Sequence, residues 1–310
     1  MNLFIIGNGF DLAHNMKTRY SDFKKYLIKK YSIKQYEIDN SVDIPTSTID
    51  QYGDDVYEDR DVVLTILRMF DSVEGERWQD IESTTGSFDY SIFLDTYDDN
   101  EYNIDKYTYY NNDDNATNLC GALKLIPNYF NEWVKTIQIV KKPINEIRNL
   151  ITNGENLFLN FNYTQTLETL YKIKEDQVCH IHGTQDQEIY FGHGNDDFDI
   201  DKTQSMWFGA ENEIEHFHRC LRKNTKSAYN KNIDFFNRLY RLKDSEFSIY
   251  SYGFSFSDVD MPYLEKIFEN INTNNVKFYI NDYDSSEKID LFSNKIKKSF
   301  NGTIETFHIN

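Results

Sequence analysis

The chain has 310 residues, with 33 Lys or Arg and 51 Asp or Glu, so its formal net charge is −18. This length suits one large α/β domain, or a core domain that carries an insertion. The acidic excess disfavours duplex nucleic acid as a partner, and three cysteines without a CxxC pair disfavour a disulfide framework or a cysteine-built zinc site. The apolar runs are too short for a signal peptide or a membrane span, so we expect a cytoplasmic protein that contacts no membrane.

The amino-terminal residues predict a strand, a glycine turn and a helix. The apolar run Leu3–Ile6 ends at Gly7 and is typical of a buried strand. Apolar residues at helical spacing predict a helix over 18–31. An α/β domain with a phosphate-binding edge begins in this way.

Residues 36–150 are expected to form a mainly helical insertion. Residues 86–118 are rich in Asp, Asn and Tyr; the aromatic residues argue against disorder and favour a partly ordered, lid-like excursion. The other predicted elements are a polar loop over 36–60, helices over 62–70 and 119–153, and a helical turn over 78–82.

Residues 1–35 and 151–310 are expected to form a Rossmann-like core. Strands alternate with helices there, which predicts an α/β fold with a doubly wound, mostly parallel sheet. The predicted strands after the insertion are 156–161, 178–181, 188–191, 247–252, 276–280 and 304–309, and the predicted helices are 164–171, 258–271 and 286–300.

The first motif is Gly7-Asn8-Gly9-Phe10-Asp11. Two glycines after a strand allow a tight turn and a close approach to a phosphate or ribose, although a plain strand-to-helix turn explains them equally well. Asp11 either caps the following helix or faces a ribose hydroxyl.

The second motif is Asn160-Phe161-Asn162-Tyr163-Thr164, at the carboxyl end of a predicted strand, where open α/β sheets bind ligands. The Asn162 amide can donate and accept hydrogen bonds, which suits a ribose hydroxyl or a water. The alternative is that Asn162 or Thr164 caps the next helix.

The third motif is His180-Ile181-His182-Gly183. Within a strand the two histidines would point to one face, and a histidine can act as a general base. Together with His193 they could form a three-histidine zinc site, but no helical HExxH pair or carboxylate spacing supports a metal. A structural histidine bonded to backbone remains the alternative for His180.

The fourth motif runs from Tyr252 to Asp260. The backbone amides after Gly253 and the side chain of Ser255 could hold a phosphate or ribose. The G-x-S pattern lacks the second glycine of a nucleophile elbow, which disfavours a serine hydrolase.

Together these blocks resemble the AbiH family of bacterial phage abortive-infection proteins, and they are also similar to the wider sirtuin-like superfamily. The resemblance to the family implies a Rossmann-like core, and the resemblance to the superfamily implies binding of NAD as a substrate or ligand. The residue spacing leads us to expect no metal. The resemblance rests on FIIGNGFDLAH at 4–14, TRYSDF at 18–23, RWQDIE at 77–82, FLNFNYTQTLETLY at 158–171, HIHG at 180–183, FGHG at 191–194 and SYGFSFSDVDMPYLEKI at 251–267.

The resemblance implies a role for each matching residue. Gly7 and Gly9 would lie against the pyrophosphate, Asn162 would orient the nicotinamide ribose or a water, and His182 would be the base. Gly253 and Ser255 would contact the adenosine half. The remaining residues expected around the nucleotide are Asn8, Phe10, Asp11, Tyr163, Thr164 and Gly183.

Two departures from the sirtuin-like pattern qualify these roles. Asn8 and Asp11 occupy the positions at which that superfamily has a small residue and a serine. This difference changes the part of the site that is expected to bind the phosphates. The cysteine tetrad that holds zinc in protein deacetylases is absent, which disfavours lysine deacylation.

The leading hypothesis is an antiphage effector that cleaves NAD to nicotinamide and ADP-ribose. The alternative is a module that binds NAD, ADP-ribose or a related nucleotide and acts through a partner defence protein; a nuclease or other hydrolase is a third reading. Homo-oligomerisation stays open. The sequence also leaves two roles open for the block that contains Trp78, Asp80 and Glu82. One of its acidic residues enters the pocket from the insertion, or Trp78 is an ordinary buried tryptophan beside a capped helix.

Overall fold

The computed structural model groups the chain into two compact units. Unit 1 comprises Met1–Arg19, Val134–Tyr190 and Asn224–Asn310, and unit 2 comprises Tyr20–Trp133 and Phe191–Lys223. The division inferred from the sequence, after residues 35 and 150, uses other boundaries. The structure describes residues 2–41, 43–72, 81–96, 106–139, 142–152, 156–194, 198–241, 247–283 and 285–309.

A six-stranded, all-parallel sheet forms the centre of unit 1. Its strand order is β5-β4-β1-β6-β7-β8, which is the order of a Rossmann fold. The prediction of a doubly wound, mostly parallel α/β sheet is therefore confirmed. The strands are β1 (Asn2–Ile6), β4 (Asn156–Asn160), β5 (Val178–His180), β6 (Phe247–Tyr252), β7 (Val276–Asn281) and β8 (Thr303–Phe307).

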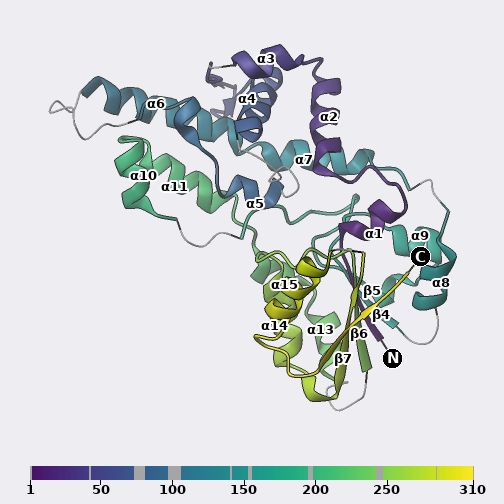
Figure 1. The fold of residues 1–310 in the computed structure, drawn as a ribbon. Helices are drawn as coiled ribbons and strands as arrows, with labels where there is room; N and C mark the ends of the chain where they lie inside the picture. Colours follow the sequence, from purple (N-terminus) through teal and green to yellow (C-terminus); the bar gives the residue numbers. More distant parts are fainter. Residues whose placement is uncertain are drawn as a thin grey trace. The chain divides into compact units, whose positions relative to one another are not determined.

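Helices cover both faces of this sheet (Figure 1). Three helices that precede β5 pack on one face, against Phe4, Phe158 and Ile6, and four helices that follow β5 pack on the other, against Leu3, Leu159 and Ile249. This arrangement makes the sheet doubly wound. The first group is α1 (Asn8–Ala13), α8 (Asn145–Ile151) and α9 (Thr166–Tyr171), and the second is α12 (Thr225–Lys231), α13 (Ile233–Tyr240), α14 (Met261–Glu269) and α15 (Ser286–Ile296).

A row of stacked aromatic rings crosses four strands on the first face. The rings of Phe158 and Phe4 lie 5.2 Å apart, those of Phe4 and Tyr250 5.1 Å, and those of Tyr250 and Tyr279 4.8 Å. Each pair occupies matching positions on neighbouring strands. Such cross-strand aromatic pairs fix the register of the sheet.

Unit 2 is mainly helical within the residues that the structure describes. Its small hairpin pairs β2 (Thr48–Ile49) with β3 (Asp55–Val56) in antiparallel fashion. Its helices are α2 (Tyr20–Lys30), α3 (Gln35–Asn40), α4 (Asp59–Ser72), α5 (Ile81–Thr85), η2 (Tyr90–Ile92), α6 (Lys106–Leu123), α10 (Ile200–Met206) and α11 (Glu211–Cys220), and α7 (Ile126–Thr136) begins there.

Several elements differ from the sequence-based prediction. The polar loop predicted over 36–60 contains α3, β2 and β3. The last part of the stretch rich in Asp, Asn and Tyr, residues 106–118, belongs to α6. No strand forms over 188–191, which are described as irregular. Helix α1 starts at Asn8, within the glycine turn, whereas the sequence predicted the first helix only at residue 18. Apolar periodicity misses these elements because they are short or polar.

Candidate functional site

The strand order places a switch point between β1 and β6. From β1 the chain first adds β4 and β5 on one side and then β6, β7 and β8 on the other. Open parallel sheets bind ligands outside the carboxyl ends of their strands at such a point. The residues that follow β1, β4, β5 and β6 are therefore the candidate site.

The glycine turn after β1 packs backbone to backbone against the loop after β6. The Gly7 amide donates to the Tyr252 carbonyl at 3.1 Å, and the Gly9 amide donates to the Gly253 carbonyl at 2.9 Å. A Cβ on Gly7 would lie 2.5 Å from the Gly253 oxygen, and one on Gly9 would lie 2.5 Å from the Gly253 Cα. Gly253 itself has a φ of +63°. Contact between two loops thus requires all three glycines.

Asp11 is a buried carboxylate at this edge, with 1% of its surface exposed. It lies inside α1, where it accepts hydrogen bonds from the Thr164 hydroxyl at 2.5 Å and the Thr166 hydroxyl at 2.8 Å. Burial raises the pKa of Asp11 to about 6, although the bonds from both threonines and from Asn162 act in the opposite direction. We call Asp11, Asn162, Thr164 and Thr166 the carboxylate cluster.

Asn162 links the ends of three strands. Its side-chain amide donates to the Gly7 carbonyl at 3.0 Å, and its backbone amide donates to the Asn160 side chain at 3.0 Å. Its carbonyl oxygen lies 3.2 Å from Nδ1 of His180, as expected for a histidine bonded to backbone. Helix α9 has Gln165 at its N-cap, so neither Asn162 nor Thr164 caps it.

His182 lies in a box of aromatic rings beside a carboxylate. Its ring is 5.3 Å from Phe161, 5.7 Å from Tyr263 and 6.2 Å from Tyr163, measured between centroids. Its Nε2 lies 3.3 Å from Oδ1 of Asp260. Only 2% of His182 and 8% of Asp260 are exposed. We call these five residues the imidazole cluster.

The expectation that His180 and His182 share one face is wrong. Strand β5 ends at His180, and His182 follows in a turn. His180 contacts Glu168 of α9, whereas His182 contacts Tyr263 of α14, which covers the opposite face. Asn162 and His182 likewise belong to two clusters that flank the carboxyl edge.

The other residues expected around the nucleotide have different surroundings. Asn8 is exposed, and its amide donates to the Thr18 carbonyl at 3.0 Å. Phe10 is 1% exposed and belongs to the core of the α1 face. Gly183 has a φ of +83°, where a Cβ would meet the Glu188 carbonyl. Ser255 is exposed and therefore accessible to a solute.

Several residues of the site carry no distinctive sequence signal. Asp260 accepts a hydrogen bond from Ser257 at 3.0 Å besides facing His182, and Glu168 lies 2.8 Å from Nε2 of His180. His14 is buried between the Phe10 carbonyl and the Tyr171 hydroxyl, at 2.7 and 2.6 Å, and burial lowers its pKa. Asp260 lies within the block at 251–267, directly before a helix, and this position is the sequence feature that could have indicated it as a site residue.

Glu82 belongs to a buried polar cluster in unit 2. Its carboxylate accepts a hydrogen bond from Lys223 Nζ at 2.9 Å and lies 3.4 Å from the Gly192 amide. His193 is fully buried nearby, with its Nε2 3.0 Å from the His218 carbonyl. Glu82 thus forms an ion pair with Lys223 within unit 2, and its neighbour Gly192 belongs to the FGHG block at 191–194.

The three histidines considered for zinc are divided between the units, His180 and His182 in unit 1 and His193 in unit 2. Within the described ranges, no group of three or more His, Cys, Asp or Glu side chains is arranged to hold a metal ion. Trp78 and Asp80 lie outside the residues that the structure describes.

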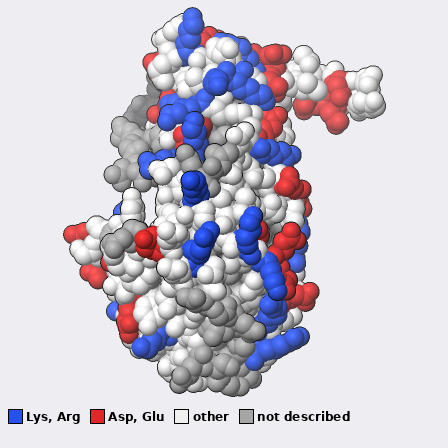
Figure 2. Space-filling model, turned by 90° about the vertical axis from the view of Figure 1, so that its right-hand side faces the viewer, with Lys and Arg blue, Asp and Glu red and all other residues white. Residues whose placement is uncertain are grey.

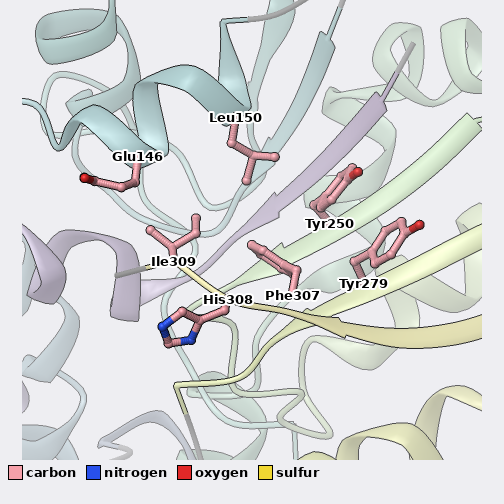
Figure 3. A pocket seen from close by; sticks show the side chains of 7 residues that line it. All are labelled: Glu146, Leu150, Tyr250, Tyr279, Phe307, His308 and Ile309. Carbon is pink, nitrogen blue, oxygen red and sulfur yellow. The ribbon is translucent and has the colours of Figure 1, made fainter.

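A cavity of about 420 Å³ lies on the α8 face of the sheet, away from both clusters. In Figure 3, Leu150 of α8 extends toward the rings of Tyr250 and Phe307, whereas the carboxylate of Glu146 points away from the tyrosines. The lining residues are Glu146, Leu150, Tyr250, Tyr279, Phe307, His308 and Ile309. None of them belongs to the predicted site.

The surface shows mixed charge on the face seen in Figure 2, where Lys and Arg side chains are spread among acidic and uncharged ones.

Among the described helices, none has the length and apolar character needed to cross a membrane.

The fold and the carboxyl-edge site define a Rossmann-like protein with a parallel sheet and buried polar clusters at its switch point. The chain matches the family described as bacteriophage abortive infection AbiH over residues 3–282. It belongs to that family, which assigns it to bacteriophage abortive infection. No curated protein and no solved structure gave a significant match.

Proposed function

We propose that the protein cleaves the nicotinamide–ribose bond of NAD during phage infection, at the carboxyl edge between β1 and β6. The observation that carries this proposal is the 3.3 Å distance between Nε2 of His182 and Oδ1 of Asp260, with His182 in the turn after β5 and Asn162 in the loop after the neighbouring strand β4. The resemblance of the motifs to the sirtuin-like superfamily supports NAD as the substrate.

The reaction needs a positioned water and a stabilised ribosyl cation. The C1′–N bond breaks, nicotinamide leaves with the bonding electron pair, and a water oxygen bonds to C1′. His182 takes the proton from this water, and the Asp260 carboxylate stabilises the resulting imidazolium. The Asn162 amide orients a ribose hydroxyl, and the negative charge of Asp11 favours the cationic transition state.

The two catalytic groups are almost fully buried, His182 with 2% and Asn162 with 6% of the surface exposed. A nucleotide that bound at the exposed Ser255 without reaching these buried groups would not be cleaved, which favours a second candidate function, a sensor that binds NAD or ADP-ribose without turnover and signals to a partner protein. Fold alone does not distinguish an enzyme from a sensor.

Nicotinamide release from NAD by the purified protein tests the proposal, with and without extract from phage-infected cells. We expect His182→Ala to lower kcat by about 10²- to 10⁴-fold, the usual contribution of a general base. Asn162→Ala should also lower kcat. His308→Ala removes an exposed histidine of the same unit and serves as the matched control. Tight NAD binding without nicotinamide release under either condition would identify the sensor instead.

A further inference from the structure

Three backbone amides of the glycine turn, which the resemblance places against the pyrophosphate, are already engaged. In dinucleotide sites, amides of the glycine turn point at the phosphates. Here the Gly7 and Gly9 amides donate to the carbonyls of Tyr252 and Gly253, and the Phe10 amide donates to the Gly7 carbonyl at 2.9 Å. A pyrophosphate would have to break these bonds to gain the same donors.

The space next to the glycines is also filled. The Gly253 backbone occupies the positions where a Cβ on Gly7 or Gly9 would stand, at 2.5 Å in each case. The absence of side chains on these two glycines therefore admits the loop after β6. No room remains between turn and loop for a phosphate group.

The charge at this end of the site points in the same direction. Asp11 accepts hydrogen bonds from the neutral hydroxyls of Thr164 and Thr166, whereas the imidazole of His180 acts on the pKa of Asp11 only through space. A carboxylate in a poorly solvated environment repels a phosphate and attracts a cationic nicotinamide or a ribose hydroxyl. Lys17 and Arg19 flank Thr18 beside Asn8, but both are exposed and so lie outside the buried cluster.

We propose that the site recognises its substrate as an N-ribosyl nicotinamide, through the ring and the ribose, and gains little from the pyrophosphate. This inference rests on the proposed function and specifies its substrate class. Nicotinamide riboside, which lacks phosphate, is then a substrate comparable to NAD. Its C1′–N bond breaks in the same way, with nicotinamide leaving, water adding to C1′ and the proton passing to His182.

The test compares kcat/KM for nicotinamide riboside, nicotinamide mononucleotide and NAD, with the purified protein of 310 residues. We expect the three values to lie within about 10-fold of one another. An enzyme that depends on two charge-assisted hydrogen bonds to phosphate would lose about 10²- to 10⁴-fold with the riboside. A loss of that size would overturn the inference and leave NAD cleavage intact. Absence of cleavage with all three compounds would overturn the proposed function, and the inference with it.

Two variants sharpen the comparison. Asp11→Asn removes the buried charge and is expected to raise the preference for NAD over the riboside. Asp258→Asn, whose side chain is 91% exposed, is the matched control and should leave the preference unchanged. In the double variant Lys17→Gln/Arg19→Gln the preference should also be unchanged; a selective loss of NAD cleavage would show that these cations bind the phosphates and would contradict the inference.

Discussion

Replacing Asp11 by Asn is expected to stabilise the protein, and to do so more strongly at pH 8 than at pH 5. Burial raises the pKa of Asp11 from 3.8 to about 6, so the folded state binds this proton more tightly than the unfolded chain. The associated stability is fully present below pH 3.8 and is lost as the pH rises through 6. The full loss is about 3 kcal/mol, and about 1.4 kcal/mol of it falls between pH 5 and pH 8.

The neutral amide that Asp11→Asn introduces can accept a bond from one threonine hydroxyl and donate to the other. Urea denaturation of wild type and Asp11→Asn at both pH values measures the effect as a difference in the free energy of unfolding. Asp258→Asn, at an exposed position, should follow the pH dependence of the wild type. The reasoning would be refuted if the free energy of unfolding of Asp11→Asn changed between pH 5 and pH 8 by the same amount as that of the wild type. It would also be refuted if the variant were least stable, relative to the wild type, at pH 8.

Three further predictions concern the free energy of unfolding and can be checked by urea denaturation followed by circular dichroism. Tyr171→Phe removes a hydroxyl that bonds His14 and the backbone amide of Ile144, and should cost about 1–3 kcal/mol; no loss would exclude these bonds. Glu82→Ala leaves the Lys223 charge buried and should lower the free energy of unfolding by about 3–5 kcal/mol. Replacing both residues by Met should cost far less. Equal losses for the two variants would contradict a buried ion pair. Gly253→Ala forces a Cβ against Gly9 at a φ of +63°, so it should cost more than about 1 kcal/mol, and a neutral effect would argue against the loop contact.

The sheet could be predicted from the sequence because its strands are short, apolar and bounded by turn residues. Strand β6 matches its predicted range of 247–252, and β1 differs by one residue. The helices of unit 2 were harder, because α3 is short and polar and α6 is rich in Asn, Asp and Tyr. Their stability comes from packing of the whole unit, and that is not visible in local periodicity.

The site was only partly accessible to sequence reasoning. Motif order correctly indicated that Gly7, Asn162 and Gly253 come together, since carboxyl ends of parallel strands meet at one edge. The pairing of His182 with Asp260 depends on the turn after β5 and on the position of α14. Neither is encoded in spacing along the chain.

The most direct test of NAD cleavage is a crystal structure with an NAD analogue whose ribose–nicotinamide bond cannot be hydrolysed. The proposal predicts that C1′ of the nicotinamide ribose lies across the carboxyl edge, with a water about 3.5 Å away that contacts the His182 imidazole. An analogue bound elsewhere, such as the cavity beside Tyr250, with His182 still enclosed by Phe161 and Tyr263, would contradict it.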